Sequence, residues 1–147
     1  MKYIKLFENF EEYDPYELMI MFPNKKAEML NSQIRKPIPN MNLVQDLITL
    51  GANLDWQDEL SSNRTSLHLA VYHNFSKIAK MLIDAGADTD IQDNWGDTPL
   101  HVAIMKNNSI IAQMLLDAGA RTDIQNHSGK VPYYYAETRE MKKLLKP

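Results

Sequence analysis

The chain has 147 residues, of which 44% are apolar and 24% charged, so its length and composition favour one globular domain with or without a short extension. The longest uninterrupted apolar run, from Leu18 to Phe22, is far shorter than the roughly 20 residues that a membrane-spanning helix needs. The absence of cysteine excludes disulfides and cysteine-based metal or redox chemistry, and the net charge of −3 gives no reason to expect nucleic acid or a membrane as partner. We expect a cytoplasmic protein, because no secretory signal pattern follows the first lysines.

Residues 1–40 carry helical patterns separated by prolines. Apolar spacing predicts helices over residues 14–22 and 25–35, with Pro23 ending the first of them, and residues 37–40 form a proline-rich connector. Three interpretations stay open for this segment: a helical cap on the repeats that follow, an arm that binds a partner, or disorder, which the aromatic content disfavours.

The rest of the chain repeats itself with a period of 33 residues. Three markers recur in phase. The first is Thr65–Ala70, repeated at Thr98–Ala103 and in a degraded copy at Val131–Ala136. The second is Asp84–Ala87, repeated at Asp117–Ala120, and the third is an Asp-x-Gln stretch after each glycine. Within each unit, apolar residues recur at helical spacing in two short blocks, which predicts two helices joined by a turn. One such unit cannot bury its own apolar face, so the units must stack.

The Thr-Pro-Leu-His-x-Ala motif at residues 98–103, together with the 33-residue period, resembles the ankyrin-repeat family. The resemblance covers residues 41–147 and implies an all-α repeat solenoid, in which helix-turn-helix units stack side by side and β-turn fingers project between them. We divide the chain into an N-terminal helical segment (1–40), a partial first repeat (41–57), two full repeats (58–92 and 93–125) and a degenerate C-terminal cap repeat (126–147).

Several residues of the repeat have predicted structural roles. Thr65 and Thr98 stand at the positions of helix N-caps, and Pro99 suits a first helical position. Gly86 and Gly119 are expected to end helices in a left-handed conformation.

Two departures from the period predict local irregularities. The first finger, residues 58–64, is two residues longer than the second, so we expect it to be distorted or mobile. The first repeat shows only its second helix, over residues 42–50, and we expect something less regular in place of its first helix.

The histidines and aspartates give no expectation of a metal or catalytic site. The resemblance implies that His68 and His101 bond to the threonine three residues before them and to the backbone of the adjoining finger. The aspartates recur at the same point of each unit, which is typical of turn capping. No nucleophile elbow, phosphate loop or metalloprotease motif is present, so we expect neither an enzyme nor a cofactor.

In the resembling family, the finger tips and the ends of the inner helices form a concave binding surface. By motif match, that surface here comprises Arg64, Tyr72, His73, Asn94, Trp95, Asp97, Met105, Lys106, His127 and Lys130. Trp95 either packs on the neighbouring finger or waits for a partner, and Tyr, Trp and Arg are frequent anchors of protein interfaces. The acidic residues of the fingers favour a partner of basic character.

The resemblance therefore implies a non-enzymatic protein–protein interaction module, with roles as a regulator or inhibitor of its partner open to it. The alternative is a structural or assembly component that uses residues 1–40 to self-associate or to dock. We expect a monomer that binds a protein and neither nucleic acid nor a membrane.

Overall fold

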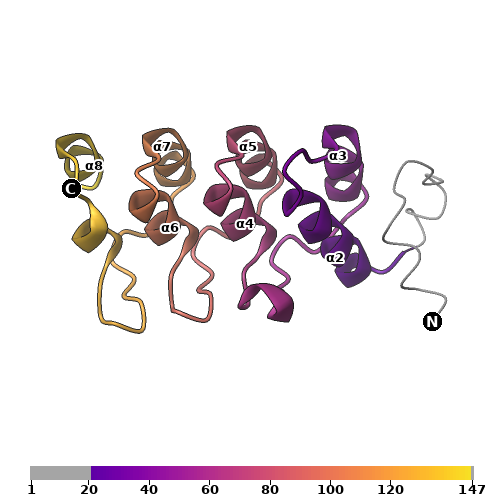
Figure 1. Cartoon of the computed structure of the whole chain (residues 1–147), viewed down its shortest axis with the longest axis horizontal. Coiled ribbons are helices and arrows are strands. Elements are labelled where there is room, and N and C mark those ends of the chain that lie inside the picture. The colour runs from indigo at the N-terminus through magenta and orange to yellow at the C-terminus, as the bar shows by residue number, and fades with distance from the viewer. Residues whose placement is uncertain (1–20, 147) are drawn as a thin grey trace.

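The computed structural model describes residues 21–146 of the chain, and in this range it contains seven α-helices, two short 3₁₀ turns and no β-strand (Figure 1). The elements are α2 (Pro23–Ile34), α3 (Met41–Thr49), η2 (Glu59–Ser61), α4 (Ser66–Tyr72), α5 (Ser76–Asp84), α6 (Pro99–Met105), α7 (Ser109–Asp117), η3 (Pro132–Tyr135) and α8 (Arg139–Leu144). No helix in this part of the chain is long and apolar enough to cross a membrane. The predicted all-α repeat solenoid is confirmed.

The helices stand in two rows that run along the molecule (Figure 1). An inner row consists of α2, α4, α6 and η3, each packed against the next, and an outer row consists of α3, α5, α7 and α8. The inner and outer members of each unit pack on each other, and the fingers project from the inner side of the stack. This arrangement places the fingers and the ends of the inner helices on one continuous surface.

Packing between units, and not the individual helices, supplies the stability of this fold. The helices of the two central repeats have seven or nine residues, and isolated helices shorter than about 12 residues are marginal in water. Each repeat therefore buries one apolar stripe against its neighbour. Leu67 and Leu100 of the inner row are fully buried, as are Leu82 and Leu115 of the outer row.

The turns of the repeats follow the predicted chemistry. The side chains of Thr65 and Thr98 accept hydrogen bonds from the backbone at the start of α4 and α6. Gly86 and Gly119 adopt φ of +89° and +90° after the outer helices, where a side chain would be strained. The turn between the two helices of a repeat is made by asparagines, Asn74 and Asn107, which also adopt positive φ.

The first repeat is more regular than the sequence suggested. The predicted helix over residues 25–35 is confirmed as α2. Pro23, which we expected to end a preceding helix, begins α2 instead, and α2 occupies the inner row against α3 and α4, where we expected an irregular segment. Proline suits this first position because the amide that it lacks has no partner inside the helix. Ser66 Oγ donates to Asn31 Oδ1 (2.5 Å), and Lys26 Nζ donates to the carbonyl oxygen of Leu50 (2.6 Å).

Residues 23–34 thus form the inner helix of the first hairpin. Nearly all of the predicted helix over residues 14–22 lies outside the described residues. Its last residue, Phe22, is the extended, exposed N-cap of α2.

The first finger shows the expected distortion. The longer finger contains η2, and the following Ser62 and Asn63 both adopt left-handed backbone conformations. The Asp58 side chain accepts a hydrogen bond from the Leu60 amide (3.0 Å) and forms an ion pair with Arg35 of the α2–α3 connection. The longer finger is therefore held against the first hairpin.

Candidate functional site

The two motif histidines connect each inner helix to the finger that follows it. His68 Nδ1 accepts from Thr65 Oγ1 (2.9 Å), and its Nε2 donates to the carbonyl oxygen of Asp97 (3.0 Å). His101 repeats this geometry with Thr98 Oγ1 (2.9 Å) and the carbonyl oxygen of Lys130 (3.0 Å). Both rings are completely buried, so these side chains hold the fold together and are not available to a ligand.

Burial of His68 makes the stability of the fold depend on pH. Burial, reinforced by the nearby charge of Arg64, lowers the pKa of His68 below its ordinary value of 6.5, although the Asp97 carbonyl and Asp93 oppose the shift. Below pH 6.5 the unfolded chain therefore binds a proton that the folded chain resists. The contribution is fully present above this pH and is lost as the pH falls, by up to about 1.4 kcal/mol per pH unit.

We accordingly expect the free energy of unfolding to be lower at pH 5.5 than at pH 7.5. Urea unfolding followed by circular dichroism at the two pH values measures this difference. The measurement is made on the His73→Gln variant, because His73 is an exposed histidine whose pKa is also lowered and which would add to the pH dependence of stability. An equal or higher stability at pH 5.5 would contradict the assignment.

The finger carboxylates bind neighbouring groups of the protein. Asp93 is buried, and its Oδ1 accepts from the amides of Trp95 (2.9 Å) and Asp97 (3.0 Å). Asp97 Oδ1 accepts from Asn126 Nδ2 (2.7 Å). Within residues 21–146, no three His, Asp or Glu side chains lie close enough together to hold a metal ion.

Hydrogen bonds also join each finger to the next. The Asn94 amide donates to the carbonyl oxygen of Ser62 (3.0 Å), and the His127 amide donates to that of Trp95 (2.9 Å). Gln92 Nε2 continues the ladder by donating to the carbonyl oxygen of Gln125 (3.0 Å). The finger tips are thus fixed relative to one another, and a partner would meet a preformed surface.

Four side chains from successive repeats meet where the inner row joins the fingers, and we call them the aromatic–cation cluster: Arg64, Tyr72, Trp95 and Lys106. The Arg64 guanidinium lies 4.7 Å from the centroid of the Tyr72 ring and 4.9 Å from that of the Trp95 ring. The Lys106 ammonium lies 4.0 Å from the Tyr72 centroid. Trp95 is nevertheless 51% exposed and Tyr72 41% exposed. Trp95 therefore contacts Arg64 of the first finger and still presents half of its surface to solvent.

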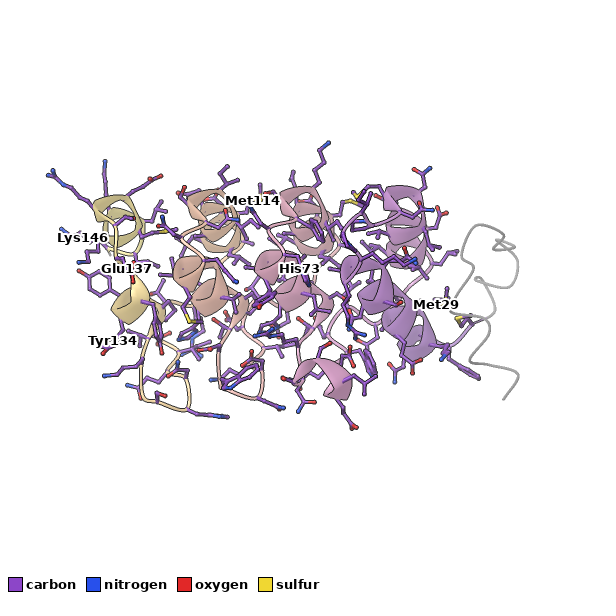
Figure 2. All side chains as sticks on the ribbon, in the orientation of Figure 1. Met29, His73, Met114, Tyr134, Glu137 and Lys146 are labelled. Atoms are coloured by element: carbon purple, nitrogen blue, oxygen red, sulfur yellow. The ribbon has the colours of Figure 1, made fainter. Side chains whose placement is uncertain are left out.

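Two further predicted residues border the cluster. His73 (labelled in Figure 2) packs edge-on against Tyr72, with ring centroids 5.3 Å apart. Partial burial lowers the pKa of His73, and the charges of Lys106 and Arg64 lower it further. Met105 precedes Lys106 at the end of α6 and is exposed. The local field at this end of the inner helices is therefore positive.

The other predicted residues are distributed over the fingers. Asn94 is exposed, and its side chain accepts from Asn63 Nδ2 (2.7 Å) in the first finger. His127 is exposed on the third finger, whereas Asp97 is half-buried and bound to Asn126. We therefore assign Asp97 to the packing between fingers and not to the exposed surface. Lys130 lies one repeat away from the cluster.

Sequence reasoning missed Tyr134 of the last repeat. Its ring is 62% exposed, and the Lys130 ammonium lies 4.0 Å from its centroid (Figure 2). The run Tyr133-Tyr134-Tyr135 replaces Leu-His-Val of the preceding repeat, and we interpreted it only as a degraded packing motif. Tyrosine tolerates exposure better than leucine because its hydroxyl remains hydrated, and this difference could have identified the position.

The sequence also gave no indication of a cleft between α2 and the first finger. This cleft has a volume of about 510 Å³. Leu60 of the finger, with Trp56 and Gln57 just before it, lines one side, and Glu28 and Arg35 line the other. It exists because the longer finger approaches α2. Neither the length of the finger nor the presence of α2 was sufficient to predict it alone.

Comparison with known proteins agrees with the repeat architecture. Residues 36–126 match the family model for ankyrin repeats in three copies. Neurogenic locus notch homolog protein 2 of Homo sapiens is 42% identical over 55 residues, which are 37% of this chain and 2% of that protein. Neurogenic locus notch homolog protein 1 of Mus musculus is 40% identical over 68 residues, 46% of this chain and 3% of that protein. The chain thus spans a very small part of the length of these relatives.

Proposed function

Because the chain belongs to the ankyrin-repeat family, whose members generally mediate protein–protein interaction, we propose that it is a non-enzymatic module that binds a protein partner through the aromatic–cation cluster and the adjoining fingers. This surface corresponds to the concave surface that the family resemblance implies. The module would act on its partner by holding or blocking it.

The observation that carries this proposal is the exposure of Tyr72 and Trp95 beside cations that already contact their rings. Residues of the repeat that serve packing, such as His68 and His101, are buried, so the exposed aromatic rings have no comparable structural role. Aromatic side chains held in one orientation lose little conformational entropy on binding, and they are enriched among interface anchors.

Alanine substitution of the two aromatic residues tests the proposal. We expect Trp95→Ala and Tyr72→Ala each to weaken capture of the partner by about 30-fold, which corresponds to about 2 kcal/mol for an interface anchor. The measurement is affinity capture by the tagged full-length chain from the cells that express it, followed by titration with the purified partner.

The control is Gln113→Ala, which removes an exposed side chain from the outer helix α7. It should leave capture unchanged. Thermal unfolding of all three variants should show nearly unaltered folds, because exposed cation–π contacts contribute only about 0.5–1 kcal/mol. Full-strength capture by both aromatic variants would refute this surface as the binding site.

The same proposal includes a monomeric chain that acts in the cytoplasm without a cofactor and binds neither nucleic acid nor a membrane. The lack of cysteine supports a reducing compartment, and the net charge of −3 disfavours polyanionic partners.

A further inference from the structure

The binding surface contains cations that no carboxylate of the described residues balances. Arg64 is matched by the buried Asp93, with Arg64 Nε 3.3 Å from Asp93 Oδ2. Lys106 and Lys130 are different, because each lies over a tyrosine ring and neither forms an ion pair within residues 21–146. Their charges remain for a ligand to neutralise.

Three finger aspartates that might have balanced these lysines are directed elsewhere. Asp58 and Asp93 are buried in the fingers, and Asp97 is bound to Asn126. The expectation of a basic partner assumed that the finger carboxylates face solvent. The carboxylates of these three aspartates are instead buried or bound within the protein. Burial lowers the pKa of His73 beside Tyr72, and the nearby charges of Lys106 and Arg64 lower it further.

Exposed carboxylates instead gather at the ends of the outer helices and in the loops that follow them. Asp84 and Asp117 are the last residues of α5 and α7, and Asp88, Asp90 and Asp123 come shortly after. Two of these carboxylates are already paired, Asp84 with Lys80 and Asp123 with Arg121, so the outer row carries charges of both signs.

Building on the proposed function, we propose that the partner segment that occupies this surface is acidic, with carboxylates that pair with Lys106 and Lys130 and an aromatic or aliphatic side chain that packs on Trp95. A carboxylate can contact an ammonium from the side opposite the tyrosine ring, so the existing cation–π contacts need not break. A basic segment would meet unbalanced lysines at the same place and would be repelled.

A peptide fits this surface better than a nucleic acid does. Affinity for a nucleic acid comes mainly from many basic residues that displace counterions, and this surface offers only two unbalanced lysines. The acidic outer loops would also repel a long polyanion, whereas a short acidic segment can remain within the positive region because salt screens charges beyond about 8 Å.

The test selects ligands from a displayed library of random peptides of about 12 residues, using the full-length chain as bait. We expect the enriched peptides to carry an excess of Asp and Glu together with an aromatic residue. Their affinities are then measured for the Lys106→Glu and Lys130→Glu variants, and each reversal should weaken binding by about tenfold or more. Lys77→Glu on α5 and Lys143→Glu on α8 make the same charge change on the outer row and should have little effect.

A second measurement is independent of affinity. Saturation with an acidic peptide should raise the pKa of His73, because the peptide carboxylates offset the charge of Lys106. NMR titration of the His73 ring with and without the peptide measures this pKa. An unchanged or lowered pKa would contradict pairing at this position.

The outcomes separate the two proposals. Enriched peptides without an acidic excess that still require Trp95 would overturn the acidic partner and leave the binding surface intact. Acidic peptides that bind Trp95→Ala and Tyr72→Ala at full strength would refute both. A fluorescent oligothymidylate that binds more tightly than the best peptide would overturn the proposal in favour of a nucleic acid.

Discussion

Replacing His101 with alanine should lower the free energy of unfolding by about 4 kcal/mol. The imidazole accepts from the backbone amide (3.2 Å) and the hydroxyl of Thr98 and donates to the carbonyl oxygen of Lys130. Each buried polar group that loses its partner costs about 1–3 kcal/mol, and the vacated volume adds a cavity term. The loss would be a large part of the roughly 5–15 kcal/mol by which small domains are stable.

Urea unfolding of the wild type and variant, monitored by far-ultraviolet circular dichroism, measures this change. His127→Ala is the control, because His127 is exposed and its structural hydrogen bond to Trp95 comes from the backbone amide, which alanine retains. The control should lose less than about 1 kcal/mol, as most exposed substitutions do. If the two variants were equally stable, the buried histidine would not be the connection between α6 and the third finger.

The second large effect is expected for Gly96→Ala, which should destabilise the fold by about 3 kcal/mol. Gly96 adopts φ of +75°, and an added Cβ would lie 2.6 Å from the backbone nitrogen and 2.7 Å from the ring Cδ2 of His127. The left-handed conformation alone costs alanine about 1 kcal/mol, and relief of the clash would have to separate two fingers at a cost of about 1–3 kcal/mol more.

Gly129 offers a matched control because it occupies the same position one repeat later. Its φ is +71°, but nothing lies within 4 Å of an added Cβ. Gly129→Ala should therefore cost only the conformational part, about 1 kcal/mol. The difference between the two variants isolates the close approach of the second and third fingers, and its absence would show that the fingers are free to separate.

Most of the fold could be predicted because residues close together in the sequence determine each hairpin. Each repeat contacts only its neighbours, so the caps at Thr65 and Thr98 and the glycines at 86 and 119 determine the hairpins without long-range information. The helix over residues 25–35 was predicted, but its role as the inner helix α2 of the first repeat was not, because it lacks the Thr-x-x-His cap and the residue before it, Phe22, makes no side-chain cap. Its inner-row position depends on contacts with α3 and α4.

The aromatic–cation cluster was predicted in part. The family pattern indicated the positions of Arg64, Tyr72, Trp95 and Lys106, and the structure brings these four side chains together. It did not indicate that Arg64 lies between two aromatic rings, nor that Tyr134 continues the pattern beside Lys130. These contacts join residues from different repeats, and they depend on how closely the repeats stack.

By itself the sequence determined that this chain is a stack of ankyrin repeats, because the period and the caps specify each hairpin and burial of the apolar stripes requires stacking. Only the tertiary structure decided which charges the surface of fingers and inner-helix ends presents. Arg64 and Asp93 are 29 residues apart in the chain, yet they neutralise each other, while Lys106 and Lys130 have no such partner in the described part of the protein. Electrostatic interactions depend on distance and burial, and the fold sets both only after the fingers have packed.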